Sequence, residues 1–137
     1  SKVVCIIGDG AMGFHVQELE TALRNELPVI YIVLCDKQWG MVKLTQTIGL
    51  QMLRPAIGTD AQGTINADFE EIAFDKVAEA MGCHGERISD PSEIEGALQR
   101  CVDSGKPSVI HVDVDQNMHL FAPGLQEFKA MHQEPGA

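Results

Sequence analysis

The sequence predicts a single α/β domain with an open, mostly parallel sheet and helices on both of its faces. Two short apolar runs, residues 3–7 and 29–35, have the length of strands buried on both faces. The first is followed by Gly8-Asp9 and the second by Asp36. An amphipathic segment lies between them, which is the order of a βαβ unit. The 137 residues are 45% hydrophobic, enough for one domain with a substantial core.

The segment between the two apolar runs is predicted to be one helix, from His15 to Leu27. Its apolar residues recur at helical spacing from Val16 onwards. Pro28 cannot continue a helix and is expected to end it. When the two strands of such a unit are neighbours, their carboxyl ends lie side by side. Ligands of open parallel sheets bind at that edge.

The rest of the chain continues the alternation of helices and strands. Asp90-Pro91-Ser92-Glu93 is a strong helix start, with a capping acid, proline at the first position and glutamate at the third. Gly82 and Gly105 are expected to end helices. The predicted elements are a helix at 41–52, a long loop at 53–67 that borders the ligand site, a helix at 75–81, a strand at 85–88, a helix from Asp90 to Gly105 and a strand at 109–115.

Gly8-Asp9-Gly10 is predicted to form a turn that binds an anion. Glycine permits positive φ and a close approach, and the helix that follows presents free N–H groups. Gly8, Gly10 and Gly13 also spell G-x-G-x-x-G, the dinucleotide fingerprint, with Asp36 as the ribose-binding acid. In that interpretation Asp9 would repel the pyrophosphate. A Mg²⁺ ion removes the repulsion, because it binds one or two carboxylates together with phosphate oxygens.

The same stretch resembles the thiamine diphosphate motif, in which G-D-G is followed, after a helix and a strand, by Asn-Asn. The surrounding pattern E-L-x-T-A-x-R at 18–24 and Leu-Pro-Val at 27–29 is similar to acetolactate synthase-like enzymes of the pyruvate oxidase group. The later stretch FDKVAEAMGC to SVIHVDVD resembles the end of the same domain. The sequence departs from the pattern at Cys35-Asp36, where the family has Asn-Asn. Asp36 still offers an oxygen ligand and adds one negative charge, whereas Cys35 cannot make the hydrogen bonds of the first Asn.

The resemblance implies a metal and cofactor site. Asp9, Asp36 and the main-chain carbonyl of Gln38 would bind Mg²⁺, and the ion would bind the diphosphate. Trp39 is either a packing anchor or part of a turn that aims the Gln38 carbonyl at the metal. The implied cofactor-binding residues are Gly8, Asp9, Gly10, Ala11, Asp36, Gln38, Gly40 and Met41.

The resemblance further implies an enzyme that uses thiamine diphosphate and Mg²⁺ to decarboxylate a small 2-oxo acid or to transfer a two-carbon unit. No catalytic residue is assigned here, because the activating glutamate of that family lies in a pyrimidine-binding domain of the same or a partner chain. We therefore expect residues 1–137 to be a single cofactor-binding domain, a C-terminal part of a larger homodimer or homotetramer, and inactive alone. The alternatives are a non-catalytic interaction module and an NAD(P)-binding Rossmann domain.

The net charge of −10 argues against nucleic acid and anionic membranes as partners. No apolar run approaches the length of a membrane span and no signal peptide is visible, so we expect a cytoplasmic protein. The four cysteines and five histidines show no metal-ligand spacing. We expect the cysteines to be small buried hydrophobes, the histidines to be ordinary surface or polar-face residues and Glu70-Glu71 to be solvated.

Overall fold

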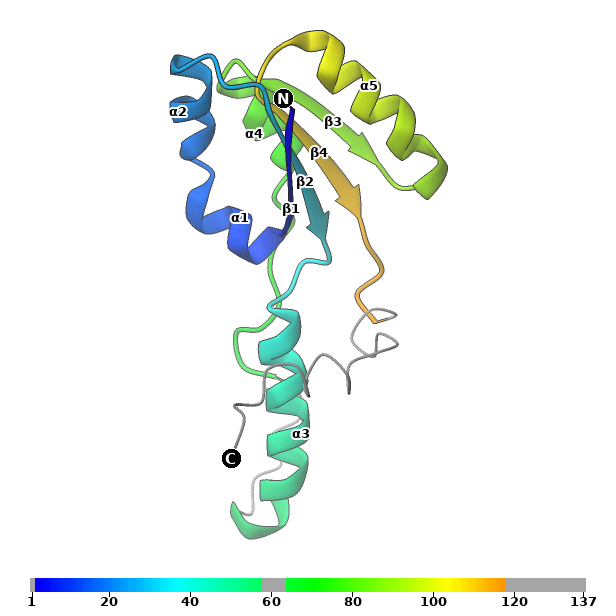
Figure 1. The fold of residues 1–137 in the computed structure, drawn as a ribbon. Helices are drawn as coiled ribbons and strands as arrows, with labels where there is room; N and C mark the ends of the chain where they lie inside the picture. Colours follow the sequence, from blue (N-terminus) through cyan, green and yellow to red (C-terminus); the bar gives the residue numbers. More distant parts are fainter. Residues whose placement is uncertain (1, 58–63, 118–137) are drawn as a thin grey trace, which may run out of the picture.

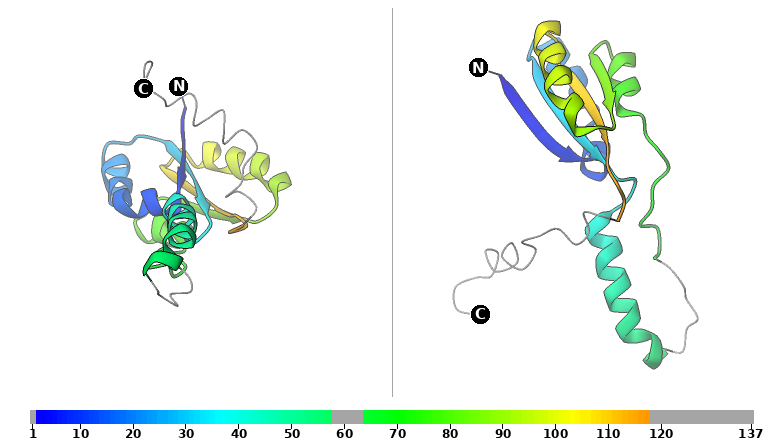
Figure 2. Two further views of the ribbon diagram at one scale, coloured as in Figure 1. Left: turned by 90° about the horizontal axis from the view of Figure 1, so that it is seen from below. Right: turned by 90° about the vertical axis from the view of Figure 1, so that its right-hand side faces the viewer.

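The computed structural model describes residues 2–57 and 64–117. They form a four-stranded parallel sheet in the order β1-β2-β4-β3, with helices on both faces, which confirms the predicted fold class (Figures 1 and 2). The strands are β1 (Val3–Gly8), β2 (Val29–Cys35), β3 (His84–Ile88) and β4 (Ser108–Asp113). The helices are α1 (Asp9–His15), α2 (Glu18–Arg24), α3 (Gly40–Ile57), α4 (Phe74–Ala80) and α5 (Ile94–Ser104), with a 3-10 turn at Pro91–Glu93.

The first two strands are neighbours, as the βαβ interpretation requires. Gly8 at the end of β1 pairs with Leu34 of β2, so the residues that follow both strands start at one edge of the sheet. On the other side of β2, Cys35 pairs with Asp113 at the end of β4. The carboxyl ends of three parallel strands therefore meet where ligands of open α/β sheets bind.

Each face of the sheet has its own hydrophobic core, because side chains along a strand alternate between the faces. In β2, Val33 packs toward α1, α2 and α4, whereas Ile32 packs toward α5. The first core consists of Met12, Leu19, Val33, Cys35, Phe74, Ala78, Cys83 and Val109. The second consists of Ile30, Ile32, Ile88, Ala97, Cys101 and Ile110.

The prediction that residues 3–7 are buried on both faces was wrong. β1 lies at the edge of the sheet and pairs with β2 alone among the described strands. Its side chains Val3, Val4 and Ile6 are 57%, 48% and 70% exposed. An apolar run indicates that a strand can be buried, but it does not tell which other elements cover that strand.

The single helix predicted from His15 to Leu27 is in fact two helices. α1 starts earlier, directly at Asp9, and α2 ends at Arg24. The side chain of Asn25 donates to the Thr21 carbonyl, and Glu26 takes a left-handed φ of 55°. The chain has therefore left the helix before Pro28, and the proline follows the helix end without causing it.

The boundary between the predicted helix at 41–52 and the predicted loop at 53–67 was also wrong. α3 runs from Gly40 to Ile57 and projects from the carboxyl edge of the sheet, away from the strands (Figure 1). Residues 58–63 of the predicted loop lie outside the described residues. Residues 64–67 are irregular and lead back to the site. On α3, Met41, Val42 and Ile48 are exposed.

The signals around α5 were read correctly. Asp90 accepts a hydrogen bond from the Ser92 amide, and the Glu93 carboxylate accepts from the Asp90 amide, which completes a capping box. Gly105 ends α5 in the left-handed conformation, with φ of 65°. The last strand is shorter than predicted and ends at Asp113.

A candidate diphosphate and metal site at the strand ends

The residues predicted to bind the cofactor lie together around one cavity of about 390 Å³ at the carboxyl ends of β1 and β2. The lining comes from two segments that are distant in sequence, 8–11 and 36–42, and the parallel pairing of β1 and β2 brings them together. Trp39 and Val42 complete the lining. The predicted residues among it are Gly8, Asp9, Gly10, Ala11, Asp36, Gln38, Gly40 and Met41.

Asp9 is the buried acid of this cavity, with 8% of its surface exposed. Its carboxylate accepts hydrogen bonds of 2.7 Å from its neighbour's amide, that of Gly10, and from the amide of Lys37. Burial raises the pKa of the Asp9 carboxyl, the two amides oppose the rise, and the negative charge of Asp36 adds to it. A buried carboxylate beside a second carboxylate is an arrangement that a cation would stabilise.

The turn after β2 is shaped by Lys37, whose φ of 58° is rare for a residue with a side chain. This conformation directs the Lys37 amide at Asp9 across the sheet edge. The turn is fixed from outside by residues 67–69. The Lys37 carbonyl accepts from the Phe69 amide and the Trp39 amide donates to the Ala67 carbonyl, both at 2.8 Å.

Gln38 contributes a side chain that sequence reasoning did not use. Its Nε2 donates to Asp36 Oδ2 at 3.1 Å and to the Gln116 carbonyl at 2.7 Å. Its Oε1 is buried and has no hydrogen-bond partner among the described residues. Two carboxylates that line one cavity fit a hard divalent cation such as Mg²⁺, which prefers oxygen ligands.

Trp39 is a packing residue in this structure, as one of its two interpretations held. Its ring packs at 4.9 Å and edge-on against Phe69, and at 5.4 Å against Phe14. It also lies on Gly10, where an added Cβ would stand 2.7 Å from Trp39 Cζ3. Gly8 has φ of −79° and Gly10 is not among the residues with positive φ. The expectation of positive φ at the glycine turn was therefore wrong, and at Gly10 the close approach is what excludes a side chain.

Cys35 stands where the family pattern has its first Asn, and it contacts Val33 and His111. It is buried, and its Sγ lies 3.4 Å from both the Val33 carbonyl and His111 Nδ1. Burial raises the pKa of the Cys35 thiol to about 12, and the charges of Asp9 and Asp113 add to the rise. The position thus holds a neutral thiol between β2 and β4. The other cysteines, at positions 5, 83 and 101, are also free. Cys83 and Cys101 are buried as expected, but the expectation was wrong for Cys5, which is only partly buried because β1 lies at the sheet edge.

A chain of ion pairs links the turn after β2 to β3 and β4. Lys37 Nζ and Arg87 Nη1 each lie 2.6 Å from the Glu71 carboxylate, and Arg87 also binds both oxygens of Asp113, at 2.7 and 2.9 Å. Glu71 is exposed, as expected, and it is also ion-paired. The sequence carried no signal for these ion pairs, because the partners come from three separate segments: the turn after β2, β3 and β4.

The fold and the site define an α/β domain that presents two carboxylates, main-chain amides and a cavity at the carboxyl ends of parallel strands. Residues 1–112 match the family model described as thiamine pyrophosphate enzyme, C-terminal TPP binding domain. The chain belongs to this family, and thiamine pyrophosphate is another name for thiamine diphosphate. The dinucleotide-binding alternative is thereby set aside.

Individual relatives agree with the family. The chain is 34% identical over 114 residues to acetolactate synthase isozyme 2 large subunit of Escherichia coli and 34% identical over 119 residues to acetolactate synthase of Bacillus subtilis. These matches cover 83% and 87% of the chain but 19% of each relative, so the chain spans about a fifth of their length.

A solved structure shows the same fold. The thiamine diphosphate-dependent 4-hydroxybenzoylformate decarboxylase of Rhodococcus jostii superimposes with a TM-score of 0.67 at 22% identity, over 83% of this chain and 20% of that one. In the described ranges, 2–57 and 64–117, no helix has the length and apolar character needed to cross a bilayer.

Proposed function

We propose that the chain binds the diphosphate end of thiamine diphosphate through Mg²⁺ held by Asp9, Asp36 and the main-chain carbonyl of Gln38. One observation carries the proposal: all the residues predicted for this role line a single cavity at the carboxyl ends of β1 and β2. The raised energy of the buried Asp9 carboxylate beside Asp36 supports a cation there. Gly8, Gly10, Ala11, Gly40 and Met41 would border the cofactor.

The parent activity is proposed to be that of a thiamine diphosphate enzyme acting on a small 2-oxo acid, either as a decarboxylase or as a synthase that transfers a two-carbon unit. Support comes from the two acetolactate synthases that are 34% identical to the chain. When bound, the cofactor supplies the carbanion that such chemistry needs. Asp9, Asp36 and the Gln38 carbonyl would hold the metal, and the metal would neutralise the diphosphate and fix its position.

The remaining parts of the proposal concern partners. A pyrimidine-binding domain of the same or a partner chain would hold the other end of the cofactor, in a homodimer or homotetramer. Exposed apolar side chains at Ile6, Met41 and Val42 provide surface on which such a domain could pack. No nucleic acid or membrane partner is proposed, and the cytoplasmic location stays a prediction.

The test uses the full-length protein. It is supplied with thiamine diphosphate, Mg²⁺ and a panel of small 2-oxo acids including pyruvate, and CO₂ release is measured. We expect release that depends on both cofactors. Asp36→Asn keeps an oxygen ligand and should retain activity, whereas Asp36→Ala should lose most of it. If no 2-oxo acid gives release while the protein still binds the cofactor, the chain serves a non-catalytic relative and the activity proposal fails.

A further inference from the structure

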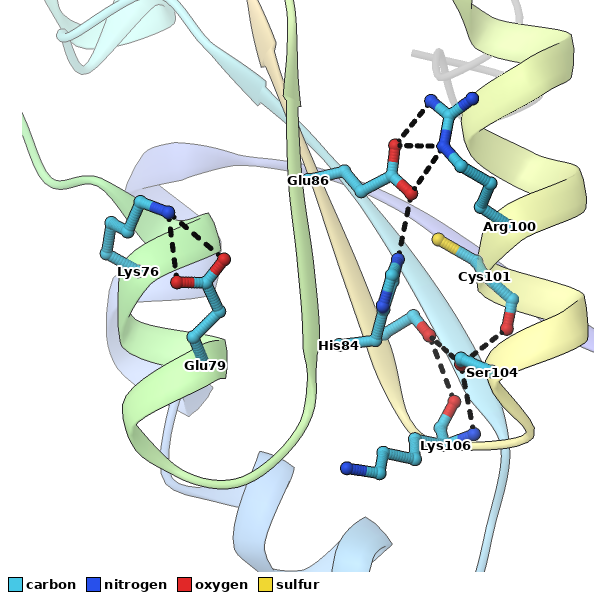
Figure 3. A network of polar contacts seen from close by, with 9 residues as sticks. Lys76, Glu79, His84, Glu86, Arg100, Cys101, Ser104 and Lys106 are labelled. Carbon is cyan, nitrogen blue, oxygen red and sulfur yellow. Dashed lines mark hydrogen bonds and ion pairs between the residues drawn. The ribbon is translucent and has the colours of Figure 1, made fainter.

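On the α5 face of the sheet, away from the cavity at the strand ends, three side chains that can ligate a metal converge. His84 and Glu86 are two residues apart on β3, so their side chains leave the same face. Cys101 faces them from α5 (Figure 3). One ligand atom from each residue lies within 4.8 Å of the other two, and His84 Nε2 is 2.8 Å from Glu86 Oε1.

We propose that His84, Glu86 and Cys101 bind a divalent cation of the Zn²⁺ class. Imidazole, carboxylate and thiolate are the three ligand types that Zn²⁺ uses, at about 2.0–2.3 Å from the metal. Three such atoms around one ion lie roughly 3.3–3.8 Å apart. His84 Nε2 and Glu86 Oε1, now 2.8 Å apart, would move slightly apart to bind the ion, and all three ligand atoms already lie within 4.8 Å of one another. A fourth position would remain for water.

The charges balance when the metal is bound. The Glu86 carboxylate and the Cys101 thiolate together neutralise one divalent cation, and His84 binds as the neutral imidazole. Cys101 is 1% exposed, and an uncompensated thiolate would be costly at such a buried position. The bound cation compensates that charge. The thiol proton leaves to solvent as the metal–sulfur bond forms. Because thiolate favours softer metals and Mg²⁺ prefers oxygen ligands, this site and the one at Asp9 and Asp36 select different ions.

Arg100 forms an ion pair with Glu86. Its Nη2 lies 2.6 Å from Glu86 Oε2 and its Nε lies 2.9 Å from Oε1 (Figure 3). The side chain of Arg100 is 59% exposed, whereas that of Glu86 is 13% exposed, so Arg100 can turn into solvent while Glu86 stays in place. The guanidinium and the metal therefore compete for one carboxylate, so removal of the Arg100 charge should strengthen metal binding.

The first test is a titration of the full-length protein with Co²⁺, in excess Mg²⁺, followed by absorbance. Cobalt replaces zinc in tetrahedral sites and reports a thiolate ligand through a near-ultraviolet charge-transfer band. We expect this band to saturate at one equivalent, to disappear when Zn²⁺ is added and to be unaffected by further Mg²⁺. Absence of the band in both the wild type and Arg100→Gln, at a large excess of Co²⁺, would overturn the proposal.

The variants identify the ligands. Cys101→Ser should abolish the band, whereas Cys83→Ser, which alters a buried cysteine of the opposite core, should keep it. Loss of an outer-shell partner alone weakens metal binding by about 10–100-fold, so His84→Ala should weaken Co²⁺ binding by at least about tenfold. Arg100→Gln should instead tighten it, because the competitor is gone.

A purely structural ion-pair network gives the opposite pattern. In that case Arg100→Gln would bind no metal and would only lower stability. Circular dichroism verifies the fold of each variant. If Cys101→Ser does not fold, the partly exposed His84 decides the matter, since an unchanged cobalt affinity in His84→Ala would exclude the site.

Discussion

The Trp39 ring lies over the main chain of Gly10, and this contact explains a residue choice at the glycine turn. A methyl group at Gly10 would stand 2.7 and 2.9 Å from two carbons of the indole, closer than side-chain carbons approach one another. Trp39 is held in turn by Phe14 and Phe69. The ring therefore cannot retreat without moving its neighbours, and the turn that carries Gln38 would move with it.

Gly10→Ala is expected to destabilise the domain by about 1–3 kcal/mol, the usual cost of overpacking. Urea unfolding measures this loss. Gly13→Ala is the matched control, because a Cβ at Gly13 in α1 meets no atom within 4 Å. Replacing a helical glycine by alanine there should stabilise the protein by roughly 0.5–1 kcal/mol. Equal effects of the two substitutions would contradict the role given to Trp39.

Cys35 is expected to resist alkylation in the folded protein. The residue is 3% exposed, and the thiol pKa of about 12 leaves almost no thiolate at neutral pH. Mass spectrometry after treatment with iodoacetamide at about pH 8 should find Cys35 unmodified, and the more accessible Cys5 should react first. Modification of Cys35 ahead of Cys5 would show that β2 and β4 open at this point.

The segment at 67–71 acts as a brace for the turn after β2. Its main chain binds Lys37 and Trp39, and its Glu71 carboxylate joins Lys37 to Arg87. The strand β4 completes the support through Asp113. The whole of α3 separates the brace from the turn in sequence. The brace nevertheless supports the left-handed conformation that Lys37 needs for its amide to reach Asp9.

Glu71→Gln is expected to weaken Mg²⁺-dependent cofactor binding several-fold, with Glu70→Gln as the control at the exposed neighbour. The contribution of Glu71 to the stability of the fold should depend on pH. Hydrogen bonds from Arg87 and Lys37 lower the pKa of the Glu71 carboxyl from 4.5 to about 2. A lowered folded-state pKa stabilises the fold fully above the ordinary value, and this contribution is lost as pH falls toward 2.

The measurement compares the unfolding free energies of wild type and Glu71→Gln between pH 6 and pH 3. The difference between the two proteins should shrink as the solution becomes more acidic. A constant difference over this range would mean that the Glu71 charge does not stabilise the brace.

Elements with strong local signals could be predicted from the sequence, and those set by distant contacts could not. The capping box at Asp90 and Glu93 and the left-handed Gly105 are encoded within a few residues, so the ends of α5 were found. The break between α1 and α2 is set by packing rather than by a local signal. The helix α3 continues to Ile57 although its sequence contains Gly49 and Pro55, which by themselves predict an earlier end.

Across the whole molecule, the candidate site could be predicted because motif residues follow strands whose parallel pairing brings their ends together. The Gln38 side chain, the ionic chain through Glu71 and the cluster at His84 could not be predicted, because each joins segments that only the folded sheet places side by side. Exposure of β1 escaped prediction for the same reason, since burial depends on neighbours.

The central claim is that Asp9 holds the metal through which the diphosphate binds. Calorimetric titration of the full-length protein with thiamine diphosphate, with and without Mg²⁺, tests it most directly. Wild type should bind only with Mg²⁺, Asp9→Asn should bind far more weakly, and Asp9→Ala should show no binding, because a carboxylate beside a diphosphate attracts it only through the cation. Unchanged Mg²⁺-dependent affinity in a folded Asp9→Ala variant would contradict the account.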